Sequence, residues 1–197
     1  MTLRRIIKRA AQGLSLVLVF PSAILCAFGR LQVSYVFFAQ WFALFPGFVG
    51  TFVRAAFYKY TLRECSIDTT ISFGTVFSSR NACVGANVSI GSFCVVGRVR
   101  IGRGTQISSH VEIPSGRHQH FRDEGGQFLD SSSAEVVIGS DCWIGASAVI
   151  MANVGDQSTI GAGSVVVKDI PDHVIAVGVP AKPIKSSRES RSPCLPS

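Results

Sequence analysis

The chain lacks any long, uninterrupted apolar run, although 47% of its 197 residues are hydrophobic. Its two most apolar stretches, residues 14–28 and 31–53, are separated by Gly29 and Arg30, and Pro21 interrupts the first. A membrane-spanning helix needs about 20 consecutive apolar residues, and proline breaks a helix interior. Neither stretch therefore qualifies as a clean membrane span.

Acidic residues are scarce, with 12 Asp and Glu against 19 Lys and Arg, which gives a net charge of +7. The basic residues are divided among the N-terminal segment, a polar loop and the C-terminal tail. A nucleic-acid-binding domain would instead gather them on one face together with aromatic residues. Nucleic acid is therefore not an expected partner, and the charge fits membrane headgroups and a phosphate-bearing ligand better.

Cysteine pairs with metal-binding spacing are also absent. None of the six cysteines forms a CxxC pair or clusters with histidine, so no metal site is indicated. We interpret them as packed, reduced thiols, which favours a cytosolic protein. The six are Cys26, Cys65, Cys83, Cys94, Cys142 and Cys194.

The sequence does contain a repeat with a period of six. Six matches neither the 3.6-residue period of a helix nor the two-residue period of a plain strand. It indicates a chain that turns regularly and returns an aliphatic side chain to the same inner line, so that stacked coils bury a continuous core. The clearest run is Ile138, Ile144, Ile150, Val154, Ile160 and Val166, and an earlier one is Val84, Ile90, Val96, Ile101, Ile107 and Ile113.

The repeat slips at two places and stops once. Val96 to Ile101 is five residues and Ile150 to Val154 is four, which we interpret as tightened corners; upstream of the earlier run the phase is ambiguous. Residues 114–135 drop the aliphatic spacing and predict a loop that leaves the solenoid. The predicted organisation is a basic and hydrophobic helical segment over 1–64, a β-helix domain over 65–186 and a disordered tail over 187–197.

The N-terminal segment allows three interpretations, two of which stay open. Basic residues precede and follow its apolar stretches, which is typical of helices that lie in a membrane surface at the anionic cytoplasmic face. Alternatively, the helices cap the open end of the solenoid. A cleaved secretory signal is disfavoured because the apolar character continues well past any cleavage point.

Three segments closely resemble the hexapeptide-repeat acyltransferases, nearest to the maltose, galactoside and exopolysaccharide O-acetyltransferases. They are Ile138-Gly-Ser-Asp-Cys-Trp-Ile-Gly-Ala, Ile160-Gly-Ala-Gly-Ser-Val-Val-Val-Lys and Gly178-Val-Pro-Ala-Lys-Pro-Ile. The resemblance implies a mainly β fold, a left-handed parallel β-helix, which departs from the usual right-handed crossover. It also implies a homotrimer that binds acetyl-CoA in the groove between two solenoids, with an active site shared by neighbouring subunits.

The same resemblance implies the site residues. Its catalytic histidine follows the last repeat before the loop and matches His118, with His120 as the competitor; an imidazole that titrates near neutrality can serve as a base. Glu112, Asp123 or a backbone carbonyl could orient the ring. Cofactor contacts are implied for Ala146 and Ala162 along the pantetheine arm, for Val167 and Lys168 in place of a Thr-Lys pair, and for Lys182 and Lys185 in place of arginines that meet the phosphates.

The expected function is acetyl transfer from acetyl-CoA to a sugar hydroxyl of a cell-surface or exopolysaccharide precursor, at the cytoplasmic face of a membrane and without a metal. The acceptor would be a small molecule or a lipid-linked glycan. Alternatives are N-acetylation of an amino sugar or another amine, and a non-catalytic β-helix scaffold. A zinc site of the carbonic-anhydrase type would need three converging histidines, and no third partner for His118 and His120 is evident.

Overall fold

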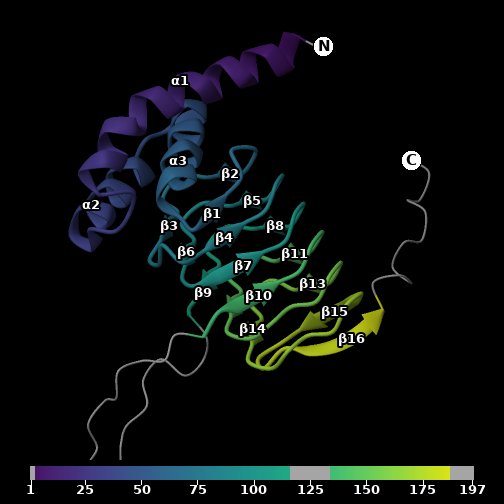
Figure 1. The fold of residues 1–197 in the computed structure, drawn as a ribbon. Coiled ribbons are helices and arrows are strands. Elements are labelled where there is room, and N and C mark those ends of the chain that lie inside the picture. The colour runs from purple at the N-terminus through teal and green to yellow at the C-terminus, as the bar shows by residue number, and fades with distance from the viewer. Residues whose placement is uncertain (1–2, 116–133, 187–197) are drawn as a thin grey trace, which may run out of the picture.

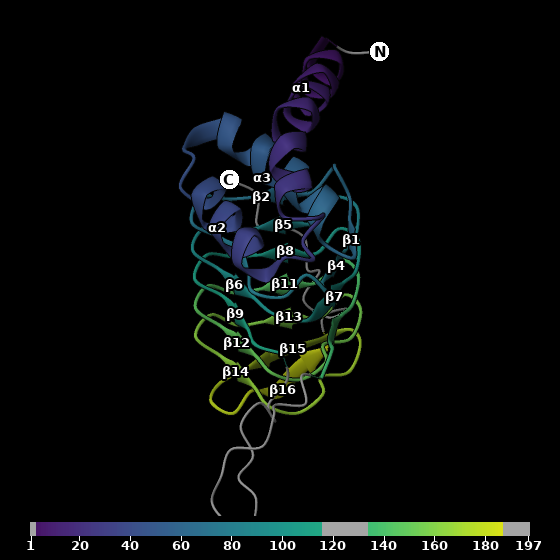
Figure 2. The ribbon, with the colours of Figure 1, turned by 60° about the vertical axis from the view of Figure 1, so that its left-hand side comes forward.

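The computed structural model describes residues 3–115 and 134–186, which form three helices followed by a β-solenoid (Figure 1). The helices are α1 (Leu3–Leu25), α2 (Gln32–Ala43) and α3 (Gly47–Thr61). Figure 2 shows them together at one end of the stacked coils. Within the described residues, no helix combines the length and apolarity that crossing a bilayer requires.

Three sheets form the walls of the solenoid, and the pairing is parallel from coil to coil. Sheet A contains β1 (Glu64–Cys65), β4 (Cys83–Val84), β7 (Val99–Ile101) and β10 (Val136–Ile138). Sheet B contains β2 (Thr70–Ile71), β5 (Ser89–Ile90), β8 (Gln106–Ile107), β11 (Trp143–Ile144), β13 (Thr159–Ile160), β15 (Val174–Val177) and β16 (Lys182–Ser186). Sheet C contains β3 (Val76–Phe77), β6 (Val95–Val96), β9 (Glu112–Ile113), β12 (Val149–Ile150) and β14 (Val165–Val166).

The predicted inward aliphatic residues form the core. Each coil contributes one inward residue per sheet, six residues apart, and these side chains are almost completely buried. The first coil supplies Cys65, Ile71 and Phe77, which resolves the phase that was ambiguous in the sequence. The predicted mainly β solenoid with an N-terminal helical segment is confirmed.

All irregularities of the repeat fall at one corner, where the chain passes from sheet C to sheet A. Within coils the six-residue spacing holds, but Phe77 to Val84 is seven residues, and the slips noted above at Val96 and Ile150 lie at the same corner. The long break between β9 and β10 is there too. A corner is free to vary in length because only the strands must keep register with their neighbours.

Helices α2 and α3 cover the open end of the first coil. The hydroxyl of Tyr35 donates a hydrogen bond to the carbonyl of Phe77 at 2.9 Å, and the amide of Phe77 donates to the hydroxyl oxygen of Tyr58 at 3.2 Å. The Tyr58 and Phe77 rings pack edge to face with centroids 4.7 Å apart. These contacts match the helical-cap interpretation of the N-terminal segment.

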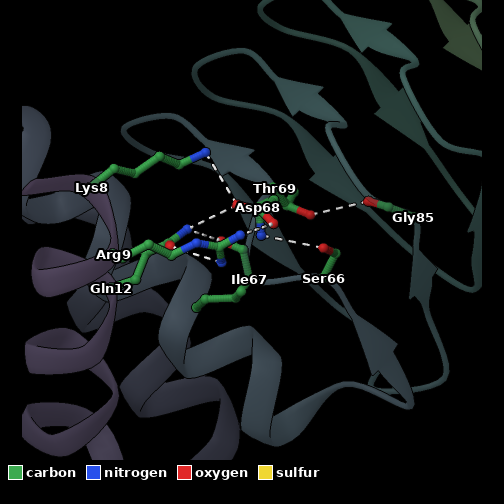
Figure 3. A network of polar contacts seen from close by, with 8 residues as sticks. All are labelled: Lys8, Arg9, Gln12, Ser66, Ile67, Asp68, Thr69 and Gly85. Atoms are coloured by element: carbon green, nitrogen blue, oxygen red, sulfur yellow. Dashed lines mark hydrogen bonds and ion pairs between the residues drawn. The ribbon is translucent and has the colours of Figure 1, made fainter. Parts of the chain in front are cut away.

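Helix α1 packs on α3 and reaches the solenoid through polar side chains (Figure 3). Gln12 Nε2 donates to the carbonyl of Ile67 at 2.9 Å, while Lys8 Nζ and Arg9 Nη2 lie 3.2 and 3.5 Å from the two carboxylate oxygens of Asp68. The hydrogen bond from Gln12, followed by the Lys8 and Arg9 charges, lowers the pKa of Asp68 below its usual value. The turn between α1 and α2 requires Gly29, since it has a φ of +83° and a Cβ there would lie 2.6 Å from the carbonyl oxygen of Thr61.

Candidate active site

Two corners of the solenoid border sheet C. In each coil the chain passes from sheet B to sheet C at what we call the BC corner, and from sheet C to sheet A at the CA corner. Between these corners the outer face of sheet C carries an apolar row with a single charge. The row is Val76, Val95, Glu112, Val149 and Val165.

The BC corner places Ala146 and Ala162 on successive coils. The amide of Gly163 donates to the carbonyl of Ala146 at 2.8 Å, and both alanine side chains are exposed. Gly145 lies so close to the next coil that a Cβ there would overlap the backbone nitrogen of Ala162. These two coils therefore stack tightly and present only small side chains at the corner, which leaves the backbone there accessible.

The CA corner holds both ends of the 114–135 loop. Ser115 Oγ accepts a hydrogen bond from the amide of Arg98 at 2.9 Å, which fixes the outgoing end on the preceding coil. Near the returning end, the amide of Val137 donates to Asn153 Oδ1 at 2.8 Å. These side-chain bonds replace ladder bonds at the corner, so the base of the loop is held although the repeat is interrupted.

Val167 and Lys168 lie at the same CA corner, directly after β14. The amide of Met151 donates to the carbonyl of Val166 at 2.9 Å, which aligns this segment with the coil to which the loop returns. The Lys168 side chain is exposed and Val167 is half-buried. The structure thus brings the Val167-Lys168 pair and the base of the loop to one edge of sheet C.

Lys182 and Lys185 lie on β16, which pairs antiparallel with β15 and closes the last coil. The amide of Ala181 donates to the carbonyl of Val165 at 2.8 Å, so β16 begins beside the end of sheet C. The Lys182 side chain is exposed to solvent. The structure thus places an exposed ammonium group close to the last strand of sheet C.

The predicted base lies outside the described residues. His118, its competitor His120 and the suggested partner Asp123 all fall within residues 116–133. Glu112, the other suggested partner for the ring, is exposed on the outer face of sheet C, two residues before the loop begins at Pro114. Among residues 3–115 and 134–186, no group of three His, Cys, Asp or Glu side chains could hold a metal ion.

One histidine at the site's edge is not among the residues that the resemblance implies. His110 lies at the BC corner with a φ of +59°, and its ring stacks on Phe93 with centroids 5.4 Å apart. The amide of Ser147 donates to the carbonyl of Ser109 at 3.1 Å, which places His110 one coil before Ala146. The repeat itself carries the signal, because His110 and Ser147 each follow an inward isoleucine by three residues.

Burial and hydrogen bonds define the roles of three residues near this site. Cys142 is buried, its thiol points to the carbonyl of Gly155 at 3.1 Å, and burial raises its pKa, so it is a packed thiol rather than a nucleophile. Trp143 points outward from sheet B and is exposed, which excludes a core role. The amide of Gly145 donates to the carbonyl of Ile160 at 2.8 Å and therefore belongs to the hydrogen-bond ladder between coils.

The comparisons with known proteins agree with this geometry. The family model described as bacterial transferase hexapeptide (six repeats) matches residues 135–168. A maltose O-acetyltransferase from Clostridium difficile 630 superimposes with a TM-score of 0.66 and 25% sequence identity, covering 77% of this chain and 84% of that one. The solenoid is a hexapeptide-repeat domain. Its fold is therefore the left-handed parallel β-helix that the resemblance implied.

Relatives of this hexapeptide-repeat domain include O-acetyltransferases. Galactoside O-acetyltransferase from Escherichia coli K12 is 44% identical over 92 residues, which are 44% of this chain and 43% of that protein. WbbJ from the same organism, named for O-acetyl transfer in lipopolysaccharide biosynthesis, is 34% identical over 122 residues, 57% of this chain and 61% of WbbJ. The matches thus span less than two thirds of either relative.

Proposed function

We propose that this chain transfers an acetyl group from acetyl-CoA to a sugar hydroxyl, with His118 as the general base. The observation that carries the proposal is that Ala146, Ala162 and Lys168 border the sheet whose CA corner also holds the base of the loop containing His118. Residues matched to cofactor contacts and the candidate base thus belong to one region. The likeness to a galactoside and a maltose O-acetyltransferase supports the choice of a sugar hydroxyl.

In the proposed reaction His118 accepts the proton of the acceptor hydroxyl. The hydroxyl oxygen attacks the thioester carbonyl, the new C–O bond forms and the C–S bond breaks. His118 then returns the proton to the thiolate, so the products are an acetyl ester and the free thiol of CoA. No acyl-enzyme is needed when both substrates are bound together, and the buried Cys142 gives no support to one.

We propose that the protein is a homotrimer in which sheet C faces a neighbouring solenoid. The apolar side chains of Val95, Val149 and Val165 on the outer face of that sheet support such an interface. Such an interface covers apolar surface that a single solenoid leaves in water. The active site would then be completed by the partner, and dissociated subunits would be inactive.

The acceptor is proposed to be a precursor of a cell-surface or exported glycan, reached from the cytoplasmic side. The name of WbbJ, which refers to lipopolysaccharide biosynthesis, supports this acceptor class. The reduced state of the described cysteines, all of which are buried and free, supports a cytoplasmic location.

The deciding experiment measures release of the CoA thiol with nucleotide sugars, lipid-linked oligosaccharides and amine acceptors. Replacing His118 with alanine should lower kcat by about a hundredfold or more while the oligomer stays intact. His173→Ala, at a histidine that lies just before β15 and away from sheet C, is the matched control and should retain activity. Normal turnover of the His118 variant contradicts the assignment, and a loss confined to His120→Ala moves the base there.

The acceptor panel also separates the rival functions. Turnover with amines alone would mean N-acetylation, and absence of CoA release with every acceptor would favour a scaffold.

A second experiment tests the phosphate contacts. Lys182→Ala/Lys185→Ala should raise KM for acetyl-CoA about tenfold with little change in kcat, because two ammonium groups that meet phosphates are removed. Lys59→Ala, an exposed lysine on α3, is the control and should leave KM unchanged. An unchanged KM in the double variant would mean that the phosphates bind elsewhere.

A further inference from the structure

Most of the exposed apolar side chains of the protein lie on the helical cap. Of the 25 large hydrophobic side chains that are exposed in the described residues, 18 lie within residues 3–49. Soluble domains rarely collect so many such side chains in one region, and a large apolar patch marks a surface that contacts something else. The helices, rather than the solenoid, therefore carry this surface.

Helix α1 presents its apolar side outward over its second half. Gln12, Ser15 and Ser22 are only 4, 6 and 8% exposed against the rest of the protein, whereas Leu14 and Leu18 are 62 and 63% exposed. Val19 and Ala23 are buried as well, so α1 is apolar on both sides and its few polar residues face the protein, whereas a surface helix in water turns its polar face outward. The outward stripe of α1 consists of Ile7, Leu14, Val17, Leu18 and Leu25.

Helix α2 and the turn after it continue the apolar surface. Val33, Phe37, Trp41 and Leu44, spaced three or four residues apart, form an outward stripe, while Tyr35, Ala39 and Ala43 are buried against the rest of the protein. Phe37 and Trp41 stack with ring centroids 6.3 Å apart, and Phe48 beyond the turn is 87% exposed. Aromatic residues of this kind are enriched where a protein meets the boundary between lipid and water.

The charge of the helical segment indicates what contacts its exposed apolar face. Residues 1–63 contain eight Lys and Arg residues and no Asp or Glu. If two copies associated through this face, two basic segments would meet without a carboxylate of either segment to neutralise their charge. An anionic membrane surface, by contrast, attracts the basic residues and can also accommodate the apolar side chains. Near the N-terminal end of α1 an open cavity of about 440 Å³ is lined by Arg5, Lys8, Arg9, Asp68 and Asn87, three cations against one carboxylate.

We propose that the outward face of α1 and α2 docks on an anionic lipid bilayer, with the apolar stripes entering the interface and the basic residues lying at headgroup level. The helices then lie in the plane of the membrane rather than across it. The helices lie at one end of the stacked coils, and the loop begins only after β9 in the third coil, so docking by the cap leaves the later coils accessible (Figure 1). The proposal goes beyond acetyl transfer and does not depend on it.

The chain offers a direct reporter of docking. It has two tryptophans, so Trp143→Phe leaves Trp41 as the sole indole. Vesicles of phosphatidylcholine with phosphatidylglycerol should shift Trp41 emission to shorter wavelength, and vesicles of phosphatidylcholine alone should do so at least about tenfold more weakly at equal lipid. An unshifted spectrum at saturating anionic lipid would overturn the proposal.

Paired variants separate the apolar and the charged contributions in vesicle co-sedimentation. Leu18→Gln/Phe37→Gln should weaken binding at least about tenfold, while Phe93→Gln, at an aromatic position on the solenoid that is 50% exposed, should not. Arg5→Gln/Arg30→Gln should remove most of the preference for anionic lipid, with exposed Arg103→Gln as its control. Circular dichroism should be unchanged in every variant.

Two results would contradict membrane docking. One is unchanged binding of Leu18→Gln/Phe37→Gln, and the other is lipid-free self-association that this double variant abolishes, which would make the face an interface between copies. CoA release with a water-soluble acceptor should be the same in this variant and the unmodified protein. Loss of vesicle binding with retained turnover supports docking, and a protein without turnover that still binds vesicles speaks only against the proposed reaction.

Discussion

Replacing Arg54 tests how the helical cap is held on the solenoid. This side chain is 1% exposed and donates from Nε to the carbonyl of Ile71 on β2 at 2.8 Å. Its Nη1 donates to the carbonyl of Phe45 at 2.7 Å and, at longer distances, to those of Phe42 and Ala43. One guanidinium therefore joins α3, the end of α2 and the first coil.

The cost of Arg54→Met follows from these contacts. Two short bonds from a charged donor are worth about 1.5–3 kcal/mol each, and the carbonyls they leave behind become buried and unpaired. The cost of burying the charge opposes the stabilisation by these hydrogen bonds, as the lowered pKa of Arg54 indicates. Methionine carries no charge, so the variant avoids this desolvation cost, and its side chain fills part of the volume. We expect a net loss of about 3 kcal/mol.

Chemical denaturation at pH 7 measures this loss, and a thermal scan should show a midpoint lower by about 6–12 °C. The stability of Arg54→Lys should lie between that of the unmodified protein and that of Arg54→Met, because one ammonium group cannot donate to both Ile71 and Phe45 at these distances. Arg103→Met, at an exposed arginine on the solenoid, controls for the change in charge. A loss below about 1 kcal/mol for Arg54→Met would refute the assignment of Arg54 as the link between cap and coil.

Three further outcomes are expected. The pKa of Asp68 is lowered in the folded state, so its contribution to stability is present above the unfolded pKa and is lost as pH falls through the folded one; Asp68→Asn should flatten the stability profile in that acidic range, measured by denaturation. Cys142, whose pKa is raised by burial, should be alkylated far more slowly at pH 8 than in the denatured chain, and equal rates by mass spectrometry would contradict its burial. Gly145→Ala should destabilise by about 3 kcal/mol through overlap with Ala162, whereas Gly13→Ala, with open space around it in a helix, should not destabilise; equal midpoints for the two would contradict the tight stacking.

The fold was predictable because its signal is local and repeated. Each coil places Ile or Val at six-residue intervals, and Ile138, Ile144 and Ile150 reveal the pattern without knowledge of any neighbour. The slips looked like separate irregularities in the sequence. Only the pairing of the strands showed that these slips share the CA corner, because the pairing assigns each strand to its sheet.

The candidate site was predictable as a set of residues and not as an arrangement. The motifs around Ala146, Ala162 and Lys168 identified the cofactor side through resemblance to a family. That Ala146 and Lys168 border opposite edges of one sheet follows from the coiling, and so does the position of His110 beside Ala146. The roles of His118 and of the lysines on β16 stay predictions.

The sequence by itself determined the solenoid, because a six-residue period specifies which side chains face inward before any contact is known. It left the N-terminal segment undecided between a cap and a membrane surface, since composition says only that the helices are apolar. Tertiary structure decided that the helices form a cap and that one side of this cap stays exposed and apolar. Tyr35, Arg54 and Tyr58 fasten one side to the first coil, which turns Leu18 and Trp41 outward, and this division between faces depends on helix packing that no local pattern encodes.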